Sequence, residues 1–126
     1  MRHIVLLLTL AAIAYLIPSA RAREIEDLRE RVRDGVQRTD KDLGNYVHRD
    51  RLNEQQRGRF DSAVKDLQAV SEAVAGGKWQ EERSRLERAV DNIEFLQKNA
   101  PIEEKDRTVL GIDVYTLRVI LDNWKP

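Results

Sequence analysis

Apolar residues recur at steps of three and four along most of this chain, and this spacing constrains the fold more than any other feature. Such steps return side chains to one face of an α-helix, and charged residues fill the other faces. Four segments carry a series of this kind: Ile25, Leu28, Val32, Val36, Thr39, Leu43 and Tyr46; Phe60, Val64, Leu67, Val70 and Val74; Trp79, Leu86, Val90, Ile93 and Leu96; Leu110, Val114, Leu117, Leu121 and Trp124. The chain is therefore predicted to be all-α.

The fourth segment also admits a strand, because residues 109–115 are rich in β-branched side chains and partly alternate. A comparison within the chain favours the helix. When the sequence is aligned with itself at a shift of 50 residues, residues of similar character coincide: Val36 with Leu86, Leu43 with Ile93, Leu52 with Ile102, Leu67 with Leu117, and Arg57 with Arg107. We therefore predict an antiparallel four-helix bundle made of two duplicated αα-hairpins, residues 23–75 and 78–125.

Residues that begin and end helices lie between the apolar series. Asn53 and Gln56 have the spacing of a capping box, and Leu52 is placed as the staple residue before the cap. The stretch Ala75-Gly76-Gly77 is expected to end the second helix, because glycine adopts the left-handed conformation without a Cβ clash. Pro101 predicts another break, since the residue before a proline disfavours the helical region.

The N-terminus has the form of a secretory signal peptide. Arg2 precedes an uncharged run of 14 residues, 4–17, and Pro18 is expected to end it. Ala20 and Ala22 then form the A-x-A pattern of a signal-peptidase site. Residues 1–22 are thus predicted to be removed, which leaves one domain, residues 23–126, in a periplasmic or secreted protein.

Two other interpretations of this run were weighed. As a helix, residues 4–17 reach only about 21 Å, short of the ~30 Å hydrocarbon core, but an uncleaved run would tether the protein to a membrane. A buried core helix is the other alternative, although the run has no polar face and so needs burial on every side.

Charge and cysteine content exclude several classes of function. Residues 23–126 carry 20 basic and 22 acidic side chains in alternation, without the basic face of a nucleic-acid-binding protein. The chain has no cysteine, which excludes disulfides, zinc–thiolate sites and covalent haem. Acids precede bases by four residues at Asp27–Arg31, Asp34–Arg38, Asp61–Lys65, Glu81–Arg85 and Glu103–Arg107, which indicates exposed helix faces.

No catalytic, cofactor or metal site is predicted. Residues 23–126 contain one histidine, His48, and no methionine, so di-iron and His/Met haem sites lack their ligands. Ser62, Ser71 and Ser84 have no glycine-bounded elbow and lie far along the chain from His48.

Five further side chains have both a structural and a functional interpretation. His48 at a helix end is interpreted as solvated rather than as a metal ligand. Asp91 and Glu94 are interpreted as a solvated acidic face, with a shared cation as the alternative. Trp79 and Trp124 are expected to pack in the core near the bundle ends, with an interaction surface as the alternative.

The stretch Leu52-Asn53-Glu54-Gln55-Gln56 resembles the LTxxQ motif of the periplasmic Spy and CpxP type of stress proteins. Leu52 and Gln56 match the motif, and Asn53 stands in place of threonine. The resemblance implies an exported, all-helical, ATP-independent chaperone or envelope-stress sensor without catalytic residues. From the residues themselves we expect a non-enzymatic protein-binding, adaptor or structural module. A metal- or small-ligand-binding bundle is the second alternative.

Overall fold

The computed structural model describes the backbone of residues 2–125 and the side chains of residues 20–125. Its elements are the helices α1 (Arg2–Tyr46), α2 (Glu54–Gly76), α3 (Arg83–Asn99) and α4 (Glu104–Asn123), and the short 3-10 helices η1 (Arg49–Arg51) and η2 (Trp79–Glu82). The described residues contain no strand, so the all-α prediction is confirmed. The strand alternative for residues 109–115 is wrong, because they lie inside α4.

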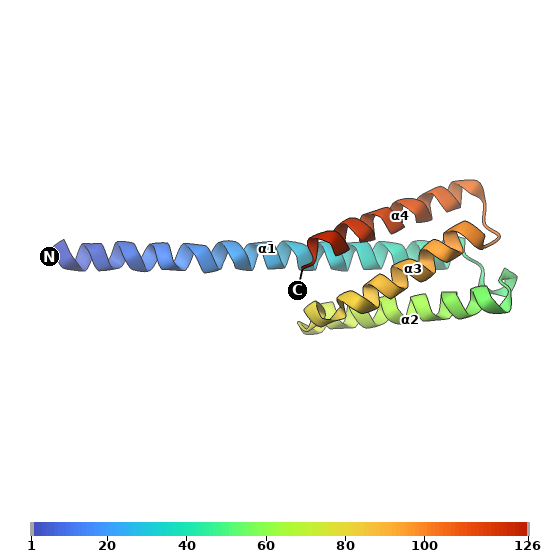
Figure 1. The fold of residues 1–126 in the computed structure, drawn as a ribbon, viewed down its shortest axis with the longest axis horizontal. Helices are drawn as coiled ribbons and strands as arrows, with labels where there is room; N and C mark the ends of the chain where they lie inside the picture. Colours follow the sequence, from blue (N-terminus) through green and yellow to red (C-terminus); the bar gives the residue numbers. More distant parts are fainter. Residues whose placement is uncertain (1, 126) are drawn as a thin grey trace.

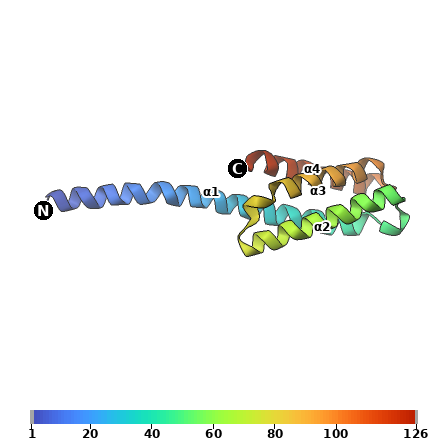
Figure 2. The same ribbon diagram turned by 60° about the horizontal axis from the view of Figure 1, so that its bottom comes forward.

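The C-terminal half of α1 lies beside α2 and α4, and the chain reverses direction at each connection (Figures 1 and 2). Helix α1 contacts α2 and α4, and α3 contacts the same two helices. The N-terminal half of α1 extends away from the other helices as a single rod, and the end of α4 lies beside the place where α1 joins them (Figure 1). Each helix of the bundle thus has two neighbours.

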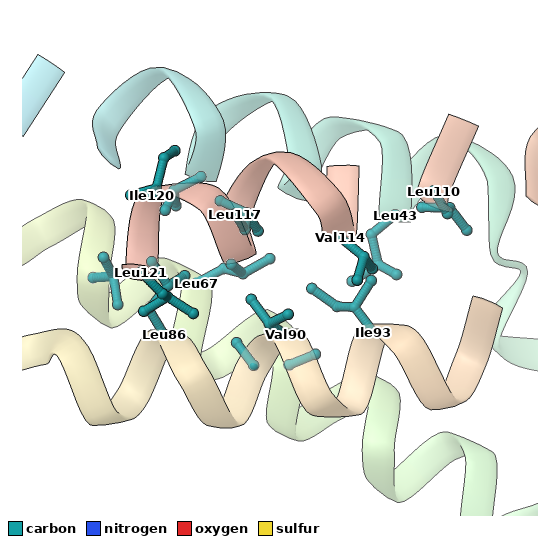
Figure 3. Close-up of a cluster of buried hydrophobic side chains, with 14 of the residues drawn as sticks. Leu43, Leu67, Leu86, Val90, Ile93, Leu110, Val114, Leu117, Ile120 and Leu121 are labelled. Atoms are coloured by element: carbon teal, nitrogen blue, oxygen red, sulfur yellow. The ribbon is translucent and has the colours of Figure 1, made fainter. Parts of the chain in front are cut away.

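The core lies between the four helices, where the predicted apolar faces meet. Figure 3 shows Leu43 from α1, Leu67 from α2, Ile93 from α3 and Leu117 from α4 converging there, and all four are fully buried. Val47, Leu52, Ala63, Ala89, Ala100 and Ile120 are also buried, although the periodic series leave them out. Burial of aliphatic side chains contributes about 25 cal/mol per Å² of apolar surface, so this core is the main source of stability.

The helix ends form where the sequence indicates. The Asn53 side chain accepts from the Gln56 backbone N–H at 2.8 Å, and the Gln56 side chain accepts from the Asn53 N–H at 3.0 Å. Helix α2 ends at Gly76, and Gly77 has a φ of 87°. Helix α3 ends at Asn99, two residues before Pro101.

The N-terminal helix is longer than predicted. Helix α1 continues through Pro18, so the expectation that this proline ends the helix is wrong. A proline removes a single backbone donor, and a helix can continue past one missing hydrogen bond. Side chains 20–27 are exposed and burial begins at Leu28.

The side chains of the run 4–17 lie outside the described part of the chain. Within the part whose side chains are described, no helix is long and apolar enough to cross a membrane.

Arginine side chains bind the carbonyls at three helix C-termini. Arg29 donates to Val74 O of α2 at 3.1 Å, and Arg83 donates to Trp124 O at the end of α4 at 2.7 Å. Arg107 donates to Gln97 O, near the end of α3, and to Ala100 O. None of the five predicted acid–base pairs occurs among the ion pairs of residues 20–125. Asp61 pairs with Arg49 instead, and Asp34, Arg85, Glu103 and Arg107 pair with residues one to three positions away.

Candidate functional site: the groove between α1 and α4

The sequence-predicted candidates for metal binding do not come together. His48 is exposed, just before η1, and caps no helix with its side chain. Arg118 of α4 donates to Asp91 at 3.2 Å and to Glu94 at 3.1 Å. Its hydrogen bond lowers the pKa of the Glu94 carboxyl. These two acids therefore bind a guanidinium, and among the described residues no three potential metal ligands cluster.

The two tryptophans pack against each other. The indole rings of Trp79 and Trp124 are 5.2 Å apart between centroids, tilted by 54°. Trp79 is 4% exposed and Trp124 is 2% exposed, so neither ring presents a surface to a partner. The contact places η2 next to the end of α4.

The interface between α2 and α3 contains polar side chains that are satisfied by one another. Asp66 is buried and accepts two hydrogen bonds from Arg88, at 2.7 and 2.8 Å. Asn92 accepts from Arg59 at 3.1 Å and donates to the Ser62 hydroxyl at 3.3 Å. The Ser62 hydroxyl and the Asn92 amide therefore have hydrogen-bond partners within this interface.

The interface between α1 and α4 is open instead. A groove of about 350 Å³ runs between these helices, and we call it the α1/α4 groove. It is lined by Leu28, Arg31, Asp34, Gly35, Arg38, Thr39, Asp113, Tyr115, Thr116, Val119, Ile120 and Asn123.

Gly35 brings the two helices close together beside this groove. A Cβ at position 35 would lie 3.0 Å from both Ile120 Cδ1 and Leu117 Cδ2. Figure 3 shows Ile120 extending from α4 toward α1. The absence of a side chain at Gly35 therefore fixes how closely α1 and α4 approach.

Asp113 is the unusual polar residue of the α1/α4 groove. It is only 3% exposed, and its Oδ2 has no hydrogen-bond partner among the described residues. Burial, and then the neighbouring Asp42 carboxyl, raise the pKa of Asp113 to about 7, and the charge of Arg38 acts in the opposite direction. The groove thus contains a buried carboxyl without a direct cationic partner.

Three apolar side chains of α4 remain exposed at the groove: Tyr115 and Val119 line it, and Ile112 lies just outside the lining. Ile112 is 57% exposed, Tyr115 is 71% exposed and Val119 is 40% exposed. Their spacing of three and four residues places them on one helix face, beside the face that enters the core. A second hollow of about 430 Å³ shares Leu28 and Arg31 with the groove and continues it along the exposed part of α1.

Residues fifty positions apart show how the two interfaces differ. At a shift of fifty residues, Arg38 corresponds to Arg88 and Asp42 to Asn92. The partner of Arg88 is Asp66, but Thr116 stands at the position that corresponds to Asp66, so Arg38 has no equivalent acid. Asp113 instead corresponds to Ala63, a buried alanine. The buried Asp66 thus has an arginine partner between α2 and α3, whereas the buried Asp113 has none between α1 and α4.

Sequence reasoning missed this site. Ile112, Tyr115 and Val119 form a second apolar series on α4, and that series was the signal that could have pointed to an exposed face. The second signal was Asp113, an acidic residue between two apolar residues in the sequence. Neither signal specifies which helix lies opposite.

Comparison of the chain with protein-family models, with curated proteins and with solved structures finds no match in any of the three. The function is therefore argued from the geometry of the site.

Proposed function

We propose that this chain is an exported, non-enzymatic helical-bundle protein that acts by binding another protein through the α1/α4 groove. The observation that carries the proposal is the exposed apolar series on α4, in which Tyr115 and Val119 line the groove and Ile112 lies just outside it. Contiguous exposed apolar side chains on a small protein mark interaction sites, because water contact with them is unfavourable. A groove between two helices is also a common binding place for a partner helix.

The finer architecture belongs to the same proposal. It is supported by the chain reversals of Figure 1 and by α2 and α4, which begin fifty residues apart at Glu54 and Glu104. We accordingly propose an antiparallel four-helix bundle that arose from a duplicated αα-hairpin. Export is proposed from the signal-peptide pattern of residues 1–22, with cleavage after Ala22.

A photo-cross-linking amino acid tests the binding function. Placed at Tyr115, it is expected to form a discrete adduct with another protein in the native compartment. The control position is Lys65, which is exposed on α2. Equal labelling from both positions, or none from position 115, would contradict a binding site at the groove.

The ATP-independent chaperone is the second candidate, and the same exposed apolar side chains support it. A chaperone needs such a surface to hold unfolded clients. The protein is then expected to suppress aggregation of a denatured client at stoichiometric amounts without ATP, and Tyr115→Ser with Val119→Ser should remove the effect. The LTxxQ-like residues support it less, since Leu52 is buried and Asn53 and Gln56 form a helix cap.

A further inference from the structure

The α1/α4 groove combines an apolar surface with a buried negative group, and this combination limits what binds there. Asp113 is a lining residue whose Oδ2 is unpartnered among the described residues, while the rest of its carboxyl lies near Asp42. A buried carboxylate without a cation is unfavourable, which is why Asp113 tends to hold a proton, so a partner that supplies a cation in place of that proton gains affinity there.

Charge complementarity points to a cationic group. The groove lining places Asp34 and Asp113 beside Arg31 and Arg38, and the Asp42 carboxyl also lies near Asp113, so three acids face two bases. Arg38 is exposed and makes no hydrogen bond to Asp113 within the described structure. On the α3 side, the Arg118 guanidinium is already held by Asp91 and Glu94.

The extent of the apolar surface favours a helix over a small ligand. The α4 residues that line the groove run from Asp113 to Asn123, about 15 Å at 1.5 Å per residue, which is about three helical turns. Ile112 is exposed but does not line the groove, so a small ligand inside it would leave Ile112 in water. A helix lying along α4 would cover Ile112, Tyr115 and Val119 together.

A second copy of this chain fits the groove poorly. The basic residues of α4 are Lys105, Arg107 and Arg118. Arg107 binds carbonyls at the end of α3, Arg118 binds two acids of α3, and Lys105 is in the first turn of α4. Two α4 faces packed together would therefore bring no central cation to Asp113.

We propose that the α1/α4 groove binds an amphipathic helix of a partner protein whose apolar face carries one lysine or arginine, and that this side chain pairs with the Asp113 carboxyl. The proposal rests on the proposed protein-binding function. The apolar residues of the partner helix pack on Tyr115 and Val119, and its cation replaces the missing partner of the buried carboxyl.

Selection from a peptide library tests this inference with the full native chain. The library consists of twelve-residue helical peptides with apolar residues at positions i, i+3 and i+7 and one randomised position inside that face. Lysine and arginine are expected to be enriched at the randomised position. For a selected lysine peptide, Asp113→Asn is expected to raise the Kd at least about tenfold, because a charge pair is lost from an apolar site.

Matched variants separate the outcomes. Asp122→Asn removes an exposed acid of the same helix and should leave the Kd unchanged, while Tyr115→Ala should weaken every peptide that uses the groove. Tyr115 is exposed, so this variant keeps the fold. A glutamine peptide that binds as tightly as the lysine peptide, with equal affinity for Asp113→Asn, would overturn the inference.

The same measurements distinguish failure of the inference from failure of the proposed function. Peptides that need Tyr115 but show no preference for a cation overturn the inference and leave the protein-binding function standing. If no selected peptide is affected by Tyr115→Ala, both fail. A dimer of the full chain in sedimentation that Val119→Asp dissociates would make a second copy the occupant and would also overturn the inference.

Discussion

Two aspartates of this protein, Asp66 and Asp113, are buried between helices but have different neighbours. Asp66 accepts two hydrogen bonds from Arg88, whereas Asp113 has a neighbouring acid and an unpartnered oxygen. A guanidinium satisfies both oxygens of a buried carboxylate, whereas a buried carboxyl beside another acid tends to bind a proton. The first residue therefore stabilises one interface, and the second leaves the other interface sensitive to pH and to partners.

Stability is expected to fall as pH rises toward neutrality because of Asp113. Its pKa of about 7 in the folded protein exceeds the ordinary value near 3.9, so the folded state binds a proton that the unfolded state releases between those values. The free energy of unfolding should therefore decrease from about pH 4 to about pH 7, by at most ~1.4 kcal/mol per pH unit from this group. Urea unfolding at pH 4.5, 6 and 8 measures it.

The Asp113→Asn variant isolates this contribution from the other carboxyls. It should be more stable than the native chain at pH 8, with a difference that shrinks toward pH 4.5. Asp122→Asn serves as the control, since Asp122 is exposed on the same helix. A stability difference that is the same at pH 4.5 and pH 8 would disprove the role of Asp113.

Removing the partner of Asp66 should destabilise the protein more than removing the pair. Arg88→Ala leaves the buried Asp66 carboxylate without its hydrogen bonds, and a loss of about 2 kcal/mol is expected. Asp66→Ala combined with Arg88→Ala should recover part of this loss, because no unpaired buried charge remains. Chemical denaturation of the three chains measures the values, and additive losses would refute the argument.

Single helices of this protein depend on their ends as well as on their apolar faces. Helix α2 begins with the Asn53–Gln56 capping box, and Gln56 also donates to Asn99 O at the end of α3 at 3.0 Å. Arg107 binds carbonyls around the same end of α3. Caps and arginines thus satisfy backbone groups that have no partner inside their own helix.

Loss of the cap should destabilise the protein measurably. Asn53→Ala removes the acceptor for the Gln56 N–H, and the free energy of unfolding should fall by about 1 kcal/mol. Thermal denaturation followed by circular dichroism measures the change. Asn45→Ala, at an exposed position near the end of α1, is the matched control and should change little. Equal melting temperatures for Asn53→Ala and the native chain would argue against the cap.

On the scale of the whole molecule, the bundle is independent of the first turns of α1. Side chains 20–27 are exposed, and the first fully buried residue is Val32. The helical rod of Figure 1 that precedes the bundle has no second helix beside it. Residues 20–27 therefore contribute no buried side chain to the described core.

Deletion of residues 1–22 should leave the bundle intact. The melting temperature of 23–126 is expected within about 2 °C of that of the full chain, measured in the same mild detergent, because no described core contact is removed. Mass spectrometry of the exported protein is expected to give an N-terminus at Arg23. An N-terminus at Met1 would contradict cleavage and would support the alternative in which residues 4–17 tether the protein to a membrane.

Local sequence patterns determined the elements of this protein and much of its core. Periodic apolar positions such as Leu43, Leu86 and Leu117 are buried, and helix ends follow Asn53 and Gly77. These features depend on neighbours within a few residues, so the sequence alone specifies them.

The tertiary structure decided the candidate site. Asp113 has the same local setting as many helical acids, and its isolation arises because α4 lies against Asp42 of α1 rather than against an arginine that binds it. Arg83 and Arg107 bind distant carbonyls for the same reason. Which residues meet across an interface depends on helix rotation and on contacts such as the one at Gly35, and the periodicity of a single helix carries no information about its neighbour.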